Sequence, residues 1–459
     1  MSALFATLTP ALGVLGMRAL GLRWRDDRLG FCAWAWLLGC LLLGLGVQLA
    51  LELHLPPGWW WTAPLVLAGL VGLLGSRVTA ASPLASPSHT IGRGYTVFVL
   101  LGVALALLFV AAGMDRPCIE GDEGNIWSLK AKSLLVDWPA QFAATQVYNL
   151  HPDYPQLNPL LQAWVYAWTG APDFVQFENR WPVQLCNVAL FVAVASALRR
   201  RLPPWPAAAL AALVLLEPEF QSLCRTAYAD GMVALGVVVA LDGLQRWREH
   251  GDRRFAWLGA FGLAFALWSK NETMLYLVAA GGAALLTRLW VPSLAGGFSR
   301  RNLRLLLPAV FVAGYSMLWN RRFGMRSDLF GNNPTGKSMF ALMAEQWPER
   351  VPALCGEALR LFVDVGHAHV VFALLLLGAV LAPRAALRSA MALPVLTLGA
   401  SFVGLHVVYV GSFLPLRFHL DTSYTRVLFQ LLPAAVVLLG CLLAEVVAAR
   451  PTGHTASRP

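Results

Sequence analysis

The run PVQLCNVALFVAVASAL at residues 182–198 contains no charged side chain and is followed directly by Arg199, Arg200 and Arg201. An apolar stretch of about 17–25 residues is long enough to cross the hydrocarbon core of a bilayer as one helix. Similar stretches recur along the chain of 459 residues, of which 58% are hydrophobic and 13% are charged. Because soluble domains carry about 25% charged residues, this composition predicts an all-α polytopic membrane protein.

Apolar runs and the residues that interrupt them predict about thirteen transmembrane helices. Their expected positions are 2–20, 30–51, 59–76, 95–113, 182–198, 204–221, 226–245, 255–269, 273–290, 303–320, 366–383, 391–411 and 427–447. We divide the chain into an N-terminal transmembrane extension of about three helices at 1–94, a transmembrane core at 95–449 and a cytoplasmic tail at 450–459.

Basic residues between these runs gather on one predicted side of the membrane. They are Arg23, Arg25, Arg28, Arg77, Arg93, the run 199–201, the cluster from Arg246 to Arg254, Arg300, Arg301, Arg304, Arg384, Arg388 and Arg450. The excess of basic residues in cytoplasmic loops assigns this side to the cytoplasm. Topology therefore accounts for the net charge of +10, and nucleic acid is not an expected partner. Arginine in excess over lysine, with much Ala, Leu and Gly, is typical of a high-GC bacterial gene, so we expect a bacterial inner membrane.

Two predicted external segments, at about 114–181 and 321–365, are too long for simple turns. Within the first, the stretch 124–136 mixes apolar and polar residues and predicts an amphipathic helix on the membrane surface. Its apolar members are Ile126, Trp127, Leu129, Leu134 and Leu135. Long loops that keep aromatic residues often carry function, although packing between helices is the alternative.

Two adjacent carboxylates, Asp122 and Glu123, stand between glycines at 121 and 124 in the first external segment. Carboxylates at a membrane interface are costly to desolvate and can act as a base or as metal ligands. A base here could remove the proton of an acceptor hydroxyl as it attacks an anomeric carbon. The alternative is a pair of solvated loop acids.

A proline-rich segment begins at His151 and continues through Asp153 and Tyr154 to Leu160. Its three prolines restrict the backbone to an extended or turn path. Such a path could present His151, Asp153 and Tyr154 to a cleft as substrate-binding residues. A simple re-entry of the chain into the next apolar segment explains the prolines equally well.

Four further charged residues stand at the predicted outer ends of the spans: Arg180, Asp230, Lys270 and Arg426. Ionisable residues at membrane depth are candidates for function. Acids and cations at one level could bind an anionic lipid head group and an acceptor together. Structural ion pairs, such as Lys270 with Glu272, remain the alternative.

The order of these positions resembles the GT-C fold of polyprenyl-phosphate-sugar glycosyltransferases. That group includes bacterial aminoarabinose–lipid A transferases and protein O-mannosyltransferases. The resemblance covers about residues 95–430. It is carried by the Asp122-Glu123 pair, the Tyr154-Pro155…Pro159-Leu160 segment, Arg180, Ala229-Asp230, Lys270 in a Ser-Lys-Asn-Glu junction, and Ser423…Arg426.

The resemblance implies a GT-C-like bundle whose first external loop carries interfacial helices, and it implies catalytic roles. Asp122 would be the catalytic base, Glu123 would assist, and Asp230 would orient the acceptor or a cation. Lys270, Arg180 and Arg426 would hold the phosphate of a polyprenyl-phosphate sugar donor. The acceptor hydroxyl could belong to a glycan, a lipid or a protein.

Whether a divalent metal is required stays open at the level of sequence, with Asp122 and Glu123 as the ligands if it is. The seven cysteines have no CxxC spacing and predict neither a cysteine zinc site nor a disulfide framework.

A transporter or lipid-linked-sugar flippase without glycosyl transfer is the main rival class. It would explain the helix number, but it predicts charges near the bilayer midplane and two repeated halves. Here the charges gather at one predicted interface and no repeat is visible. A non-catalytic assembly subunit would have no reason to place acids and cations at one level.

Overall fold

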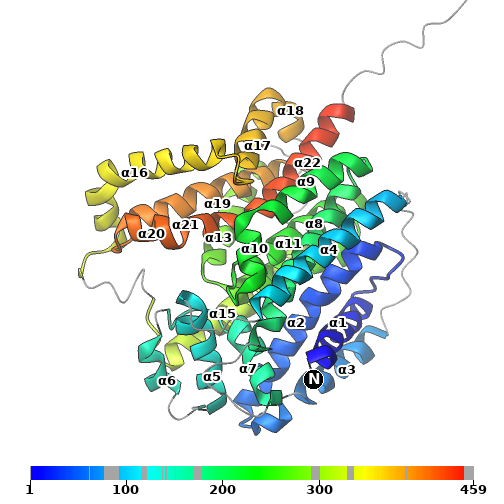
Figure 1. Cartoon of the computed structure of the whole chain (residues 1–459), viewed down its shortest axis with the longest axis vertical. Coiled ribbons are helices and arrows are strands. Elements are labelled where there is room, and N and C mark those ends of the chain that lie inside the picture. The colour runs from blue at the N-terminus through cyan, green and yellow to red at the C-terminus, as the bar shows by residue number, and fades with distance from the viewer. Residues whose placement is uncertain are drawn as a thin grey trace, which may run out of the picture.

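The computed structural model describes residues 2–60, 62–76, 92–114, 121–136, 138–139, 142–149, 151–169, 178–290, 300–327, 335–387 and 391–448. Every regular element within these residues is a helix, which confirms the all-α prediction (Figure 1). The predicted cytoplasmic tail lies outside the described residues, as do 115–120 and 170–177 of the first predicted external segment and 328–334 of the second.

Among the described helices, four are long and apolar enough to cross a membrane, judged by length and composition. They are α2 (Arg28–Glu52), α4 (Arg93–Gly113), α8 (Trp181–Arg199) and α19 (Ala392–Val410), with a fifth if α9 (Pro204–Leu216) and α10 (Pro218–Arg225) form one bent span. A helix lies at each of the thirteen predicted positions. The described helices support a helical, membrane-associated protein, whereas thirteen spans stay a prediction.

The N-terminal helices α1 (Ser2–Ala19), α2 and α3 (Thr62–Ser76) pack against one another, and α2 also contacts α7 (Leu157–Thr169) and α8. Asp27 caps the N-terminus of α2 by accepting a hydrogen bond from the backbone N–H of Gly30. Such a cap satisfies one of the donors that a helix start leaves unpaired. The contacts of α2 with α7 and α8 join these three helices to the central bundle.

The central hairpin consists of α11 (Asp230–His250) and α12 (Arg253–Ser269). Gly251 ends α11 with a φ of 68°, a left-handed conformation that glycine adopts without steric cost. Along the hairpin the backbones approach closely, since a Cβ on Gly243 would lie 2.6 Å from the backbone nitrogen of Gly259. Small residues permit this approach. The hairpin returns the chain to the end of the bundle where α11 began.

Two helices, α9 and α10, occupy the predicted span at 204–221. The chain bends by 59° between α9 and α10. Pro218 is the first residue of α10, where its ring and missing N–H prevent the continuation of α9. Glu217 lies at this break and is fully buried.

The first predicted external segment contains helices before its proline-rich stretch, and a further helix begins within that stretch. A π-helical turn (Glu123–Ser128) leads into α5 (Leu129–Val136), in the range of the predicted amphipathic helix. It is followed by α6 (Phe142–Thr145), a 3-10 turn (Gln146–Tyr148) and α7. The sequence did not lead us to expect α7, which is almost entirely buried, Asn158 and Gln162 included.

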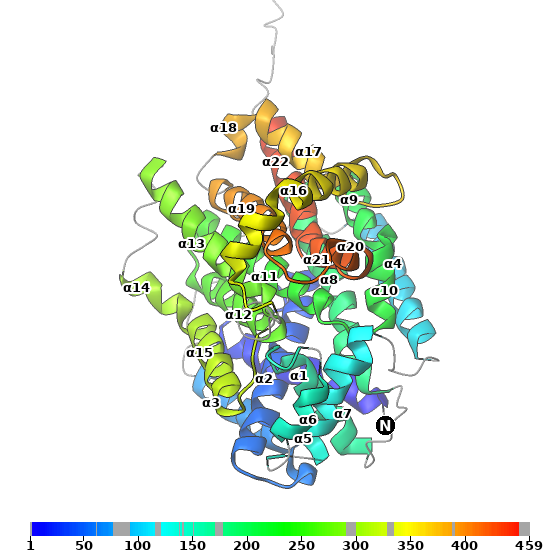
Figure 2. The ribbon, with the colours of Figure 1, turned by 90° about the vertical axis from the view of Figure 1, so that its left-hand side faces the viewer.

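In Figure 2 the C-terminal helices lie mainly to the left of and above the central hairpin. Its elements are α13 (Glu272–Trp290), α14 (Arg300–Leu303), a 3-10 turn (Arg304–Leu306), α15 (Leu307–Arg322), α16 (Met339–Val363), α17 (Val370–Leu381), α18 (Pro383–Ala386), α19, α20 (Leu416–Thr422), α21 (Tyr424–Phe429) and α22 (Leu432–Ala448). The long helix α16 lies in the second predicted external segment. α19 packs against α13, and α22 packs against α17.

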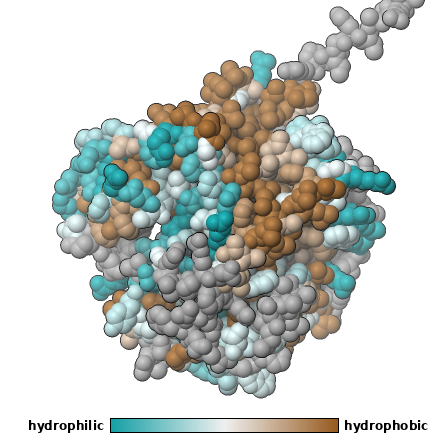
Figure 3. Space-filling view, viewed as in Figure 1, coloured by the Kyte–Doolittle hydropathy of each residue, from teal (hydrophilic) through white to brown (hydrophobic). Residues whose placement is uncertain are grey.

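Exposed hydrophobic side chains form a broad band over the face that carries α4, α9 and α17 (Figure 3). They include Leu100, Leu101, Leu108, Trp205, Leu376, Leu377 and Leu381. Hydrophilic side chains gather at the left of the same view, where Figure 1 has α16 and α20. An exposed apolar surface of this kind marks a membrane or partner contact.

Candidate active site

Four of the residues singled out from the sequence meet in one ion-pair cluster. Lys270 Nζ lies 2.9 Å from Asp230 Oδ1, and Arg426 Nε lies 3.6 Å from Asp230 Oδ2. Arg426 also pairs with Asp122 through Nη2 and Oδ2, which are 2.5 Å apart. We call Asp122, Asp230, Lys270 and Arg426 the central cluster.

Each member of the central cluster stands at or near the end of a helix. Asp230 is the first residue of α11, and Lys270 follows the last residue of α12 in an extended conformation. Arg426 belongs to the short helix α21, and Asp122 directly precedes the π-helical turn. Because α11 and α12 form a hairpin, the ends of the two helices that lie away from the connecting turn bring Asp230 and Lys270 together.

The members differ in exposure. The side chains of Asp230 and Lys270 are buried, whereas the side chain of Asp122 is 28% exposed. Gln430 donates a hydrogen bond of 2.6 Å to Asp230 Oδ1 and accepts one of 2.7 Å from the Tyr276 hydroxyl. Both carboxylate oxygens of Asp230 thus contact protein partners, whereas Asp122 is the carboxylate of the cluster that a small molecule can reach.

Lys270 carries a second ion pair, with Glu272 Oε1 at 2.9 Å. Burial by itself would lower the pKa of Lys270, but Asp230 and Glu272 raise it above its ordinary value. Lys270 is therefore a permanent cation. The pair with Glu272, foreseen as the structural alternative, exists alongside the pair with Asp230.

Glu123 and Arg180 form a separate buried pair, with Glu123 Oε1 3.2 Å from Arg180 Nε. The same carboxylate oxygen accepts a hydrogen bond from the backbone N–H of Ala227. Arg180 Nη1 donates to the backbone carbonyls of Gly113 and Arg225, each at 2.9 Å. Arg180 thus lies outside the central cluster, and its guanidinium holds the ends of α4 and α10 together, whereas its phosphate contact stays a prediction.

The proline-rich segment packs against the junction that carries Lys270. The ring of Tyr154 lies between those of His151 and Trp127, with centroids 4.6 and 5.3 Å away, and Lys270 Nζ lies 5.8 Å from its centroid. Burial first, and then the surrounding carboxylates, raise the pKa of Tyr154 well above its ordinary value. The hydroxyl of Tyr154 thus stays protonated.

Asp153 differs from the expectation that it faces a cleft. It is buried, and Asn271 Nδ2 donates a hydrogen bond of 2.8 Å to its carboxylate. Lys130 Nζ donates to the carbonyls of Pro152 and Tyr154, each at 2.7 Å. Burial lowers the pKa of Lys130 to about 7, although Asp153 partly opposes this effect. Asp153 and Lys130 therefore fix the segment in place.

The expected metal ligands Asp122 and Glu123 point to different arginines and do not converge on one position. Among the described residues, one group of three potential ligands does converge: Glu217, His367 and His369. The sequence patterns did not reveal this group. The only local signal is the His-Ala-His spacing at 367–369, and Glu217 comes from a helix break about 150 positions away.

No protein-family model, curated protein sequence or solved structure matches this chain.

Proposed function

We propose that the protein is a membrane glycosyltransferase that transfers a sugar from a polyprenyl-phosphate donor to an acceptor hydroxyl on the non-cytoplasmic side. The observation that carries the proposal is the central cluster, in which a reachable carboxylate, Asp122, lies beside two buried cations. A transferase with this donor needs both kinds of group. The carboxylate takes the acceptor proton, and the cations stabilise the departing phosphate.

The reaction would be a direct displacement at the anomeric carbon. The acceptor oxygen forms a bond to this carbon while its proton passes to Asp122. The bond between the anomeric carbon and the phosphate oxygen breaks, and its electron pair leaves with the polyprenyl phosphate. Lys270 and Arg426 are placed to hold that charge, and the anomeric configuration would be inverted.

Charge balance gives Arg426 a specific role. Lys270 and Arg426 together meet three carboxylates: Asp122, Asp230 and Glu272. A phosphate can therefore bind favourably only by replacing one of them. Asp122 is the most exposed of the three. Donor binding at Arg426 would release Asp122, and the base would become free when the donor is in place.

An apolar cavity of about 440 Å³ supports a lipid-linked donor. It is lined by α1, α2, α3, α12 and α15, and Trp257 and Trp268 of α12 border it. Eleven residues of helix separate these tryptophans, so the cavity follows α12 for about 16 Å. Since Lys270 comes two residues after Trp268, a lipid tail in this cavity would bring its head group near the central cluster.

Asp230, Arg180 and Glu123 would act by positioning. Asp230 orients Lys270 and Arg426, and the Glu123–Arg180 pair secures the turn that carries Asp122. Tyr154 and His151 form the aromatic wall nearest to Lys270, which is a suitable surface for a sugar ring.

The proposal can be tested in a deletion strain of the source organism, whichever sugar is transferred. Mass spectrometry would measure polyprenyl-phosphate sugars and cell-envelope glycans after complementation with wild type, Asp122→Asn or Glu345→Gln. Glu345 is an exposed carboxylate on α16 and is the matched control. We expect the deletion and Asp122→Asn to accumulate one lipid-linked sugar and to lack one glycan modification.

Wild type and Glu345→Gln should both restore that modification. Restoration by Asp122→Asn, or a deletion strain whose lipid-linked sugars and glycans are unchanged, would contradict the proposal. Accumulation of the donor on the cytoplasmic face, with transfer intact in opened vesicles, would point to a flippase instead.

A further inference from the structure

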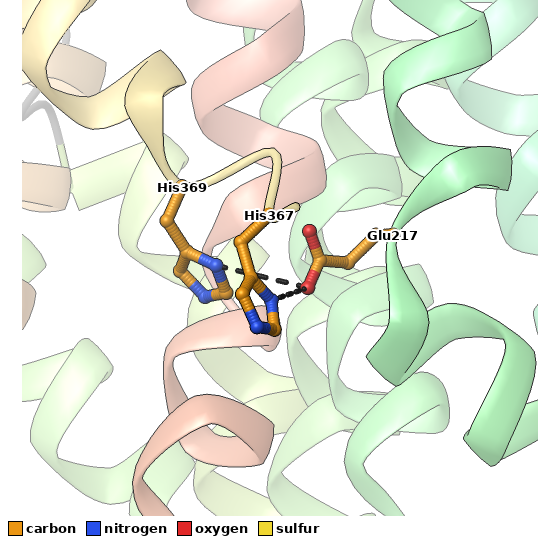
Figure 4. A group of neighbouring side chains, drawn as sticks. All are labelled: Glu217, His367 and His369. Atoms are coloured by element: carbon orange, nitrogen blue, oxygen red, sulfur yellow. Dashed lines mark hydrogen bonds and ion pairs between the residues drawn. The ribbon is translucent and has the colours of Figure 1, made fainter. Parts of the chain in front are cut away.

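Glu217, His367 and His369 form a compact group outside the central cluster (Figure 4). Glu217 stands at the break between α9 and α10, His367 lies in the turn that precedes α17, and His369 is the residue directly before α17. The group therefore joins two parts of the chain that are about 150 positions apart. Neither the ion pairs of the central cluster nor the proposed transfer reaction uses these side chains.

The separations of the three side chains suit a common ligand. Glu217 Oε1 lies 2.8 Å from Nδ1 of His367 and 3.7 Å from Nδ1 of His369. All three potential ligand atoms lie within 4.8 Å of one another. Around a tetrahedral ion with bonds of about 2.0–2.1 Å, ligand atoms are about 3.3 Å apart. The two measured distances bracket this value, so small side-chain rotations would complete the site.

Of the three side chains, His369 is the one whose hydrogen-bonding groups the surrounding protein leaves poorly satisfied. Glu217 and His369 are fully buried. Neither ring nitrogen of His369 makes a regular hydrogen bond among the described residues; its polar neighbours are Glu217 Oε1, at 3.7 Å, and the backbone of Thr425. Buried polar groups without a partner are costly and are rare in folded proteins. A ligand that binds an imidazole nitrogen would remove this cost.

We propose that Glu217, His367 and His369 bind one divalent transition-metal ion, with zinc the expected ion. Two imidazoles and one carboxylate are a ligand set that suits zinc, whereas magnesium and calcium prefer oxygen ligands. The other carboxylate oxygen, Glu217 Oε2, accepts a hydrogen bond of 2.5 Å from the backbone N–H of Ala368. Such an outer contact fixes the orientation of a ligand. His367 is 22% exposed and gives the ion a path of entry.

The ion would act as a clamp between two segments. It would hold the turn before α17 against the α9–α10 break, where burial of Glu217 otherwise depends on two hydrogen bonds. The same break is tied to α21 by Glu219, whose Oε1 accepts a hydrogen bond from the Thr425 hydroxyl. Thr425 directly precedes Arg426. The clamp would therefore also stabilise the position of α21.

The test measures metal binding on the full-length protein, purified in detergent without a histidine tag. The protein is stripped with a chelator, and zinc sulfate or magnesium chloride is then added. Elemental mass spectrometry measures bound zinc, and a thermal-shift assay measures the melting temperature. We expect about one zinc ion per chain and a melting temperature raised by several degrees with zinc but not with magnesium.

His367→Asn and Glu217→Gln should each weaken zinc binding at least about 100-fold, since loss of an outer contact alone costs 10–100-fold. His54→Asn, at an exposed histidine, is the control and should bind zinc as wild type does. Because His367 is only partly buried, its variant keeps the test valid if Glu217→Gln does not fold.

Zinc binding that is equal in wild type and His367→Asn would overturn the assignment. So would a stripped protein that binds no zinc, or one that magnesium stabilises equally. These measurements do not involve glycosyl transfer, so failure of the metal site and failure of the proposed function are distinguishable.

Discussion

Arg426 Nη2 lies 2.5 Å from Asp122 Oδ2, although the two residues are 304 positions apart in the chain. The contact joins the first predicted external segment to the short helix before α22. Arg426 also faces Asp230 at 3.6 Å and lies over the ring of Tyr228, with its guanidinium carbon 4.3 Å from the ring centroid. A cation held by two acids can exchange one of them for a phosphate without leaving its place.

The first prediction concerns Asp122→Asn. Loss of a general base typically lowers a rate about 10²–10⁴-fold, and we expect a decrease of this size in sugar transfer in membrane vesicles. The melting temperature should change little, because Asp122 is partly exposed and Arg426 keeps its pair with Asp230. Glu345→Gln serves as the control for both measurements. Normal turnover by Asp122→Asn would rule out the assigned base.

The second prediction concerns Lys270→Met alone and with Asp230→Asn. Among the described residues, removal of the lysine leaves buried Asp230 with one cationic partner, the more distant Arg426, and breaking such a pair typically costs about 3–5 kcal/mol. We expect a strong fall in the melting temperature for the single variant. The double variant should recover most of it, since an asparagine amide oxygen can still accept the hydrogen bond from Gln430.

Donor binding separates this structural effect from a role in phosphate binding. Neither variant should bind the lipid-linked donor with normal affinity, even where stability is restored. An unchanged apparent affinity in the stable double variant would remove Lys270 from the phosphate site.

The sequence predicted the central cluster because each member has a local signal. Asp230, Lys270 and Arg426 are charged residues at the ends of apolar runs, and helices that alternate in direction bring every second end to one level. The contact partners could not be predicted. Whether Lys270 meets Glu272, Asp230 or both depends on side-chain packing between α11, α12 and α13, on which periodicity carries no information.

The sequence did not predict the helix α7 or the group of Glu217, His367 and His369, because both depend on contacts between distant parts of the chain. The helix α7 begins within the proline-rich segment and has Asn158 and Pro159 in its first turn, so the sequence gives no clear signal for the start of a helix. Its amides are satisfied within the fold, since Asn158 donates to the Ala227 carbonyl and Gln162 donates to Asn158. The group of Glu217, His367 and His369 had no signal at Glu217, because an acid after an apolar run is usually a helix end.

The third prediction concerns Asp27→Asn, at the opposite end of the bundle. Asp27 accepts hydrogen bonds from the Gly30 N–H and the Ser196 hydroxyl, and it pairs with Arg246. Hydrogen bonds to a charged group contribute about 1.5–3 kcal/mol, so we expect a destabilisation of this order in a thermal or denaturant assay. Arg246 retains Asp242 as a partner, which limits the loss.

Sugar transfer per folded molecule should not change in Asp27→Asn. Arg246 is sixteen residues along α11 from Asp230, which corresponds to about 24 Å. A large decrease in turnover of the folded variant would indicate that the buried charges at this end also take part in function. The comparison with Asp122→Asn thus distinguishes a structural carboxylate from a reactive one.

The fourth prediction is a pH dependence caused by Lys130. Its pKa is about 7 in the folded protein, because burial disfavours the charged form. In the unfolded chain the pKa is about 10.4. Between these values the unfolded chain binds a proton that the folded protein lacks, so the contribution of Lys130 to stability increases with pH over this range, and its loss is complete once the pH has fallen to about 7.

We therefore expect wild type to gain roughly 1.4 kcal/mol of stability per pH unit between pH 7 and 9, relative to Lys130→Met. Melting temperatures of both proteins at pH 6, 7, 8 and 9 measure this difference. The variant should be less stable throughout, because the Pro152 and Tyr154 carbonyls lose their donor. Lys337→Met, at an exposed lysine, should follow wild type at every pH. A constant difference between wild type and Lys130→Met from pH 6 to 9 would mean that Lys130 is not neutral in the folded protein, and that its two carbonyl contacts come from an ammonium group.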